Sequence, residues 1–241
     1  MMGILNVGAI QKELAEVEQE LVSLPDSNLY QRKNYFHYVV QGKEVGITRK
    51  PAIIRQLCRR AYLCKRQTQL MHNLTAPITE YVPTSAFALI QQLPSIYQRF
   101  PIEYFYHPSV TKWLAKPPRF NTLKPEDAVY TYQNINFRSL SEREIAQKLT
   151  ENHLLYYYDA TFNLTHAIIS PDFYIKNPFT GKIYLWEHFG AFHRTGYSER
   201  TNDKMLIYAK IGFHENNNLM TTYNYHLRLP NGLQQQIDRI I

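Results

Sequence analysis

Two acidic residues, Asp172 and Glu187, each interrupt a run that is otherwise apolar and aromatic. The segment between them contains Asn177-Pro178-Phe179-Thr180-Gly181, which favours a hairpin loop because Pro suits an early turn position and Gly accepts a left-handed backbone. A turn centred on Phe179 and Thr180 pairs Asp172 with Glu187. Directly opposed residues have Cβ atoms about 4.5–5.5 Å apart, so the two carboxylates repel each other unless a cation or a proton lies between them. The hairpin therefore predicts a divalent metal site.

The chemistry expected of this acid pair, Asp172 and Glu187, depends on burial. Both faces of the two strands are apolar or aromatic, which is typical of central strands, where an unpaired carboxylate is costly. Mg²⁺ takes one or two carboxylates and leaves positions for water and phosphate oxygens, and it stabilises charge that develops on a phosphoryl group. The alternative is that Asp172 accepts a hydrogen bond from a turn or backbone amide, while Glu187 pairs with an Arg or a Lys. His188 alternates to the other face of the strand, where a structural role is expected.

The elements around the hairpin predict an α/β layout, a mixed α+β fold with helices covering a mixed sheet. Ser141 is a candidate cap for a helix over residues 139–152, and Glu142 and Glu144 suit the positive end of its dipole. Strand-like runs follow at 154–158, 168–189 and 219–225. Further helices are expected at 201–211, ending at Gly212, and at 232–241.

The motifs around the acid pair resemble those of PD-(D/E)XK nucleases. Ser-Pro-Asp172-Phe followed by Trp-Glu187-His-Phe-Gly is similar to the branch whose second motif reads WEHLG, and residues 138–142 are similar to its RSKSE segment. The resemblance implies a restriction-endonuclease-like core and an Mg²⁺-dependent nuclease, with Mn²⁺ able to substitute. It also implies that Asp172 and Glu187 hold the metal, with the His188 carbonyl as a further possible ligand, and that Glu142 supports the site.

The chain departs from this family where the E-x-K lysine belongs, because that position holds Phe189. In the similar branch the lysine has migrated to the next helix, in a K-x-x-x-Y-x-x-x-G pattern that Lys204, Tyr208 and Gly212 match. The resemblance therefore implies that Lys204 positions the attacking water and offsets negative charge. A solvated lysine on a helix surface is the alternative.

The sequence divides into three expected regions. Residues 1–75 hold an N-terminal helix, a small hairpin and a basic helix, and residues 76–137 form a Pro- and Tyr-rich connecting layer with a helical patch at 85–92. Residues 138–241 form the nuclease-like core. The N-terminal part also resembles an extension found on bacterial proteins with this core. Its first helix has an apolar stripe that indicates packing on its own domain or, alternatively, a short coiled coil.

A basic stretch runs through the second helix, and it is either a solvated face or a surface that contacts the phosphates of nucleic acid, with DNA favoured. The candidate contact residues are Arg55, Arg59, Arg60, Lys65 and Arg66, with Arg194 on a later loop. Nearby aromatic residues, Tyr30 and Tyr35 among them, are candidates for stacking on bases or for a core.

Composition narrows the class of protein. The chain has 241 residues, 44% of them hydrophobic, and a net charge of +7, which favours a polyanionic partner. Two cysteines in neither zinc nor disulfide spacing, and no apolar run of the roughly 18 residues that span a bilayer, predict a cytoplasmic protein without membrane contact. Two other functions stay open: a catalytically inactive nuclease-fold module that binds nucleic acid, and a protein–protein adaptor that uses the N-terminal helix.

Overall fold

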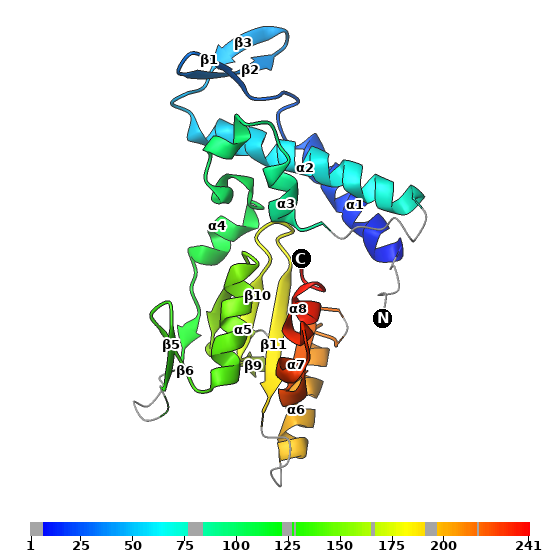
Figure 1. Ribbon diagram of the computed structural model, residues 1–241, viewed down its shortest axis with the longest axis vertical. Helices are drawn as coiled ribbons and strands as arrows, with labels where there is room; N and C mark the ends of the chain where they lie inside the picture. The colour runs from blue at the N-terminus through cyan, green and yellow to red at the C-terminus, as the bar shows by residue number, and fades with distance from the viewer. Residues whose placement is uncertain are drawn as a thin grey trace. The chain divides into compact units, whose positions relative to one another are not determined.

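The computed structural model describes residues 7–76, 84–121, 127, 129–164, 167–190, 197–215 and 217–241. The chain forms two compact units, Met1–His107 and Pro108–Ile241 (Figure 1). Among the described helices, none is both long enough and apolar enough to cross a membrane.

Two long helices form the body of the first unit. Helix α1 (Val7–Val22) lies along α2 (Pro51–Thr75), and its stripe residues Ile10 and Val17 are buried (Figure 1). Pro51 opens α2, the expected basic helix, since Pro is favoured in the first turn of a helix. The apolar stripe of α1 thus packs within its own unit, as one of the two alternatives predicted, and not in a coiled coil.

A small antiparallel sheet lies between these helices in the sequence. Strands β1 (Tyr30–Arg32), β2 (Tyr35–Val40) and β3 (Lys43–Gly46) form a three-stranded meander, where the sequence predicted a two-stranded hairpin. The difference arises at Lys33, which takes a left-handed backbone (φ 53°) and turns the first predicted strand back on itself.

The expected connecting layer is divided between the two units. Helix α3 (Ala86–Gln91) lies where the helical patch was expected, and Ser85 caps it. This helix and the 3-10 turns η2 (Tyr97–Arg99) and η3 (Ile102–Phe105) belong to the first unit. Helix α4 (Ser109–Leu114), strand β4 (Arg119–Phe120) and the hairpin of β5 (Tyr130–Tyr132) and β6 (Ile135–Phe137) belong to the second.

The second unit is built on a four-stranded sheet in the order β12-β11-β10-β7. Its strands are β7 (Leu155–Tyr158), β10 (Phe173–Lys176), β11 (Ile183–Phe189) and β12 (Leu219–Tyr223). The pair β11–β12 is parallel and the other pairs are antiparallel, so the predicted mixed sheet is confirmed.

Helices lie on both faces of this sheet (Figure 1). Helices α5 (Leu140–Glu151) and α8 (Gly232–Ile237) share a buried core with β10 and β11 that includes Ile145, Ile237, Phe173 and Trp186. Helix α6 (Tyr197–Lys210) contributes Tyr208 to a second buried cluster, with Leu185 and Leu219 of the sheet. Helix α7 (Asn224–Arg228) follows β12 directly.

The first strand of the predicted hairpin is two strands. Residues Ala167–Ile169 form β9, which pairs with β8 (Ala160–Leu164), and β4 pairs with the other edge of β8. The chain then bends at Asp172 before β10 begins. Asp172 therefore lies at a bend beside the sheet and not within a continuous strand.

Candidate active site

The register that aligns the two acids is the predicted one. Phe173 pairs with Trp186 and Ile175 pairs with Tyr184, and the next position in this register places Asp172 opposite Glu187. Two backbone contacts fix Asp172: its Oδ2 accepts a hydrogen bond from the His188 amide at 2.7 Å, and its carbonyl accepts one from the amide of Asp159 at 2.9 Å.

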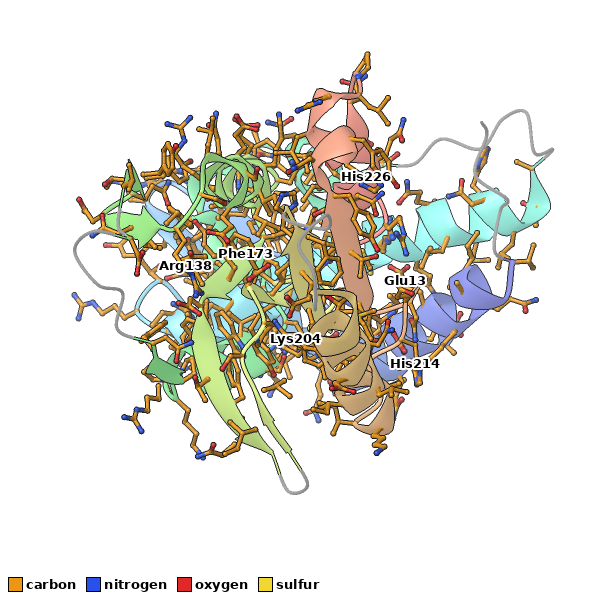
Figure 2. The ribbon with its side chains drawn as sticks, turned by 90° about the horizontal axis from the view of Figure 1, so that it is seen from below. Glu13, Arg138, Phe173, Lys204, His214 and His226 are labelled. Carbon is orange, nitrogen blue, oxygen red and sulfur yellow. The ribbon has the colours of Figure 1, made fainter. Side chains whose placement is uncertain are left out.

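Glu187 receives two side chains from α6. Its Oε2 accepts a hydrogen bond from Lys204 Nζ at 2.7 Å, and its Oε1 accepts one from the Tyr208 hydroxyl. Lys204 and Tyr208 are four residues apart on a helix, so both lie on the side of α6 that faces Glu187. Figure 2 labels Lys204 on this helix. The K-x-x-x-Y spacing thus brings both groups to a single carboxylate.

The charge balance of this pocket favours protons or cations. Glu187 is 2% exposed, and its burial, with the charge of Asp172 as the next cause, raises the pKa of Glu187 to about 8. Lys204 and Tyr208 act in the opposite direction, since both stabilise the carboxylate. The single ammonium group of Lys204 therefore does not compensate for the charge of the neighbouring Asp172 and for the hydration that Glu187 loses on burial.

Glu142 lies at the N-terminal turn of α5 and has a structural role there. The helix cap is Ser139, where the sequence favoured Ser141: Ser139 Oγ accepts from the Glu142 amide at 3.2 Å, and Glu142 Oε2 accepts from the Ser139 amide at 3.1 Å. This is a capping box, whose second member must lie three residues after the cap. The Tyr158 hydroxyl also donates to Glu142 Oε2 at 2.8 Å. Burial and then the charge of Asp172 raise the pKa of Glu142, which links it to the acid pair electrostatically.

Asp159 is a further acid that the sequence reasoning missed. It is 5% exposed, has a left-handed backbone (φ 47°) and forms an ion pair with Arg138. Its Oδ1 accepts a hydrogen bond from Asn121 at 2.8 Å, while its buried Oδ2 has no hydrogen-bond partner among the described residues. No motif signals this position, because the contact depends on a residue of the preceding segment and on the turn between β7 and β8.

His188 and Phe189 occupy structural positions. The His188 ring is bonded to Thr222 Oγ1 at 3.0 Å and to Asn224 Oδ1 at 3.3 Å, and burial lowers its pKa. The expected structural role of His188 is confirmed. Phe189, at the position where the resemblance leads one to expect a lysine, is buried beside the ring of Tyr223.

The described residues hold no group of three His, Cys, Asp or Glu side chains arranged to bind a metal ion. The acid pair makes the contacts that the alternative to a metal site anticipated: Asp172 accepts from a backbone amide, and Glu187 pairs with a lysine. The oxygen donors still suit Mg²⁺, which needs few protein ligands and keeps several waters. A metal at Glu187 would have to replace Lys204 on one carboxylate oxygen.

The basic residues predicted to contact nucleic acid are mostly engaged within the first unit. Arg59 is 4% exposed and binds Glu20 through Nε at 2.8 Å and Nη2 at 2.7 Å, and Arg66 Nε binds Glu13 at 2.7 Å.

The remaining candidates divide into three groups. Arg60 forms an ion pair with Asp26. Arg55 is exposed over the ring of Tyr104, and Lys65 is half-buried. Arg194 lies outside the described residues. Arg55 and Lys65 are thus the described candidates that no ion pair engages.

Comparisons with known proteins returned nothing: no family model, no curated protein and no solved structure matches this chain.

Proposed function

We propose that the second unit is a metal-dependent nuclease with a restriction-endonuclease-like core of the PD-(D/E)XK type, acting on phosphodiester bonds of DNA in preference to RNA. One observation carries the proposal. Lys204 Nζ lies 2.7 Å from Glu187 Oε2, and Glu187 is aligned with Asp172 by the hairpin register. Two acids and a lysine thus converge from the bend before β10, from β11 and from α6.

The electrostatics of the pocket support a cation at the acid pair. Burial first, and then the charge of Asp172, raise the pKa values of both Glu187 and Glu142, so a bound cation would stabilise carboxylates that have lost water and lie near another acid. Asp172 and Glu187 would hold Mg²⁺ or Mn²⁺, leaving positions for water and phosphate oxygens. When bound, the metal would stabilise the negative charge that builds on the phosphoryl group.

The chain's own residues would have separate tasks. Lys204 would move from Glu187 to the attacking water and to the phosphate, where its ammonium orients the one and offsets charge on the other. Tyr208 would keep Glu187 in place through Oε1. The His188 amide would hold Asp172 in its rotamer. Glu142 would support the site by fixing the start of α5 and by adding negative potential near Asp172.

A cleavage assay tests this function. The full chain is incubated with single-stranded and duplex DNA and with RNA, with Mg²⁺ or Mn²⁺ and with EDTA. We expect cleavage that requires the metal and is lost in Asp172→Asn. Asp238→Asn is the matched control, because Asp238 is an exposed acid of the same unit. Equal activity in Asp172→Asn, or activity that persists in EDTA, would contradict the proposal.

A specific observation favours a second candidate, an inactive nuclease-fold module that binds nucleic acid. Both oxygens of Glu187 have donors, and Asp172 has the His188 amide, so the pocket is a satisfied hydrogen-bond network as it stands. This candidate predicts nucleic-acid binding without cleavage on every substrate and with either metal.

A further inference from the structure

One face of the small β1–β3 sheet is lined by exposed aromatic side chains. Side chains alternate between the faces of a strand, and directly paired residues share a face. The pairs Tyr30–His37 and Arg32–Tyr35 therefore lie on one side of the sheet with Glu44. Ion pairs of Glu44 with Arg32 at 3.1 Å and with His37 at 3.7 Å confirm that these side chains share that side. We call this side the tyrosine face.

The other side of the sheet packs within the unit. Phe36 lies on it, and its ring is 5.2 Å from that of Phe100, with the Arg99 guanidinium 5.7 Å from the Phe36 ring centroid. The sheet thus uses one side for its own core, and the tyrosine face is turned to solvent.

The two tyrosines of this face are unusually open for large rings. Tyr30 is 46% exposed and Tyr35 is 63% exposed. They occupy diagonal positions on neighbouring strands, where side chains lie about 7–8 Å apart. Neither ring packs against another ring within the part of the chain that the structure describes. Two flat platforms are therefore presented side by side.

Exposed basic side chains lie on the small sheet, in its turns and at the start of α2: Arg32, Lys33, Lys43, Arg49, Lys50 and Arg55. By strand alternation Arg32 lies on the tyrosine face, whereas Lys43, which pairs with Val40, lies on the other side. Arg55 lies over Tyr104, whose ring stacks on that of Phe100. Glu44 is the acid of the sheet, and Arg32 neutralises it. Lys43, Arg49 and Lys50 form no ion pair with a described residue, whereas Arg59 of α2 is buried on Glu20. The sheet and its turns therefore carry several basic side chains without an ion pair to a described residue, whereas Arg59, Arg60 and Arg66 of α2 are each paired with an acid.

We propose that the tyrosine face binds single-stranded nucleic acid, with bases stacked on Tyr30 and Tyr35 and phosphates on nearby lysines and arginines. Aromatic platforms combined with nearby basic side chains are what single strands require, because every unpaired base offers a face for stacking. A duplex keeps its bases stacked on one another and offers those faces only at its ends. The proposal shares its class of ligand with the proposed nuclease but does not depend on cleavage.

Binding to the full chain in EDTA tests the stacking part, with a labelled single-stranded oligonucleotide and its duplex followed by fluorescence anisotropy. We expect the single strand to bind more tightly, and the double substitution Tyr30→Leu, Tyr35→Leu to raise its Kd by about tenfold or more. The double substitution to Phe keeps the rings and should retain affinity. Both pairs change exposed side chains, so circular dichroism and the thermal midpoint should match the parent protein.

Salt dependence tests the phosphate part. The slope of log K against log salt is negative, and the double substitution Arg49→Ala, Lys50→Ala should reduce its magnitude by about 0.7 for each phosphate that the variant no longer neutralises. Lys12→Ala, at an exposed position on α1, is the control for removal of charge alone.

The outcomes of this proposal and of the proposed nuclease are separable. Binding that fails for single strands, or that the Leu variants leave unchanged, would overturn the tyrosine face whether or not the chain cleaves DNA. Binding that behaves as expected in a chain without cleavage would reject the nuclease and leave the tyrosine face intact.

Discussion

Each unit holds a carboxylate with little exposure beside a basic side chain: the side chain of Glu20 is 18% exposed and that of Glu187 is 3% exposed. The two arrangements differ in kind. In the first unit, Arg59 grips Glu20 through two nitrogens and gives a third hydrogen bond to the Phe105 carbonyl at 2.9 Å. In the second, Lys204 makes one contact with Glu187, and its side chain is 35% exposed. The planar guanidinium of Arg59 uses its donors in a fixed geometry and holds α1 against α2. The ammonium of Lys204, at the end of a flexible side chain, can exchange one acceptor for another.

The surrounding charges separate the two pairs further. Glu20 of α1 pairs with Arg59 of α2 and also has His107 Nε2 at 3.9 Å, so no excess of acids over bases arises there. Lys204 serves a pocket with Glu187 and Asp172 in register and Glu142 nearby, and the pKa of Glu187 is raised to about 8 in spite of it. Burial of a charge therefore does not by itself indicate a functional site. The second pair differs from the first because acids outnumber bases around it, and this excess is what makes it a candidate site.

Breaking the first pair should have the largest effect. Arg59→Met removes both hydrogen bonds to Glu20 and leaves that carboxylate largely buried, which we expect to lower the free energy of unfolding by about 3 kcal/mol. Urea unfolding followed by circular dichroism measures it. Arg55→Met, at an exposed position one turn earlier in α2, should change stability by less than about 0.5 kcal/mol. An equal, small effect of both substitutions would contradict the structural role given to Arg59.

Breaking the second pair should affect catalysis more than folding. Lys204→Met removes the group proposed to orient water and offset charge, and we expect metal-dependent cleavage to fall about 10²-fold in kcat. Stability should change little, because Glu187, with its raised pKa, becomes neutral by taking up a proton. Lys210→Met tests an exposed lysine of the same helix and should leave cleavage intact. A Lys204→Met variant that is strongly destabilised but cleaves normally when folded would contradict this account, because Lys204 would then have a structural role and not a catalytic one.

A smaller effect is expected at Tyr208. Tyr208→Phe leaves Glu187 Oε1 without its donor in a buried position, and we expect a loss of about 1–2 kcal/mol in the free energy of unfolding. Tyr174→Phe is the matched control, because Tyr174 packs against the same buried cluster and its hydroxyl bonds to no described residue. Similar losses in the two variants would show that the hydrogen bond to Glu187 carries no special weight.

The sequence predicted the features that depend on residues close together in the chain, such as turns and the faces of helices. The loop at Asn177 to Gly181 fixed the register of β10 and β11, since a turn of given length admits one pairing of the flanking strands. The resemblance implied that Lys204 reaches the acid pair, and its four-residue spacing from Tyr208 puts both on one side of α6. These two features account for the alignment of Asp172 with Glu187 and for the arrival of Lys204.

The features that the sequence did not predict depend mostly on contacts between residues that are distant in the sequence. Arg59 reads as one more basic residue of α2 until Glu20 of α1 is placed beside it. Asp159 gains its burial from Arg138 and Asn121, which no spacing connects to it. The meander was missed for a different reason, because Lys33 adopts a left-handed backbone that lysine seldom takes and that Asn or Gly would have signalled.

Calorimetric titration of the full chain with Mg²⁺ at pH 6.5 and pH 8.5 tests the central claim most directly. A metal binds the ionised carboxylate, and a proton held with a pKa of about 8 competes with it, so affinity should rise by at least about tenfold between these pH values. Glu187→Gln should abolish both the binding and its pH dependence. Binding that follows this course supports a metal site at Asp172 and Glu187. No binding at either pH, or binding that Glu187→Gln leaves unchanged, would contradict it.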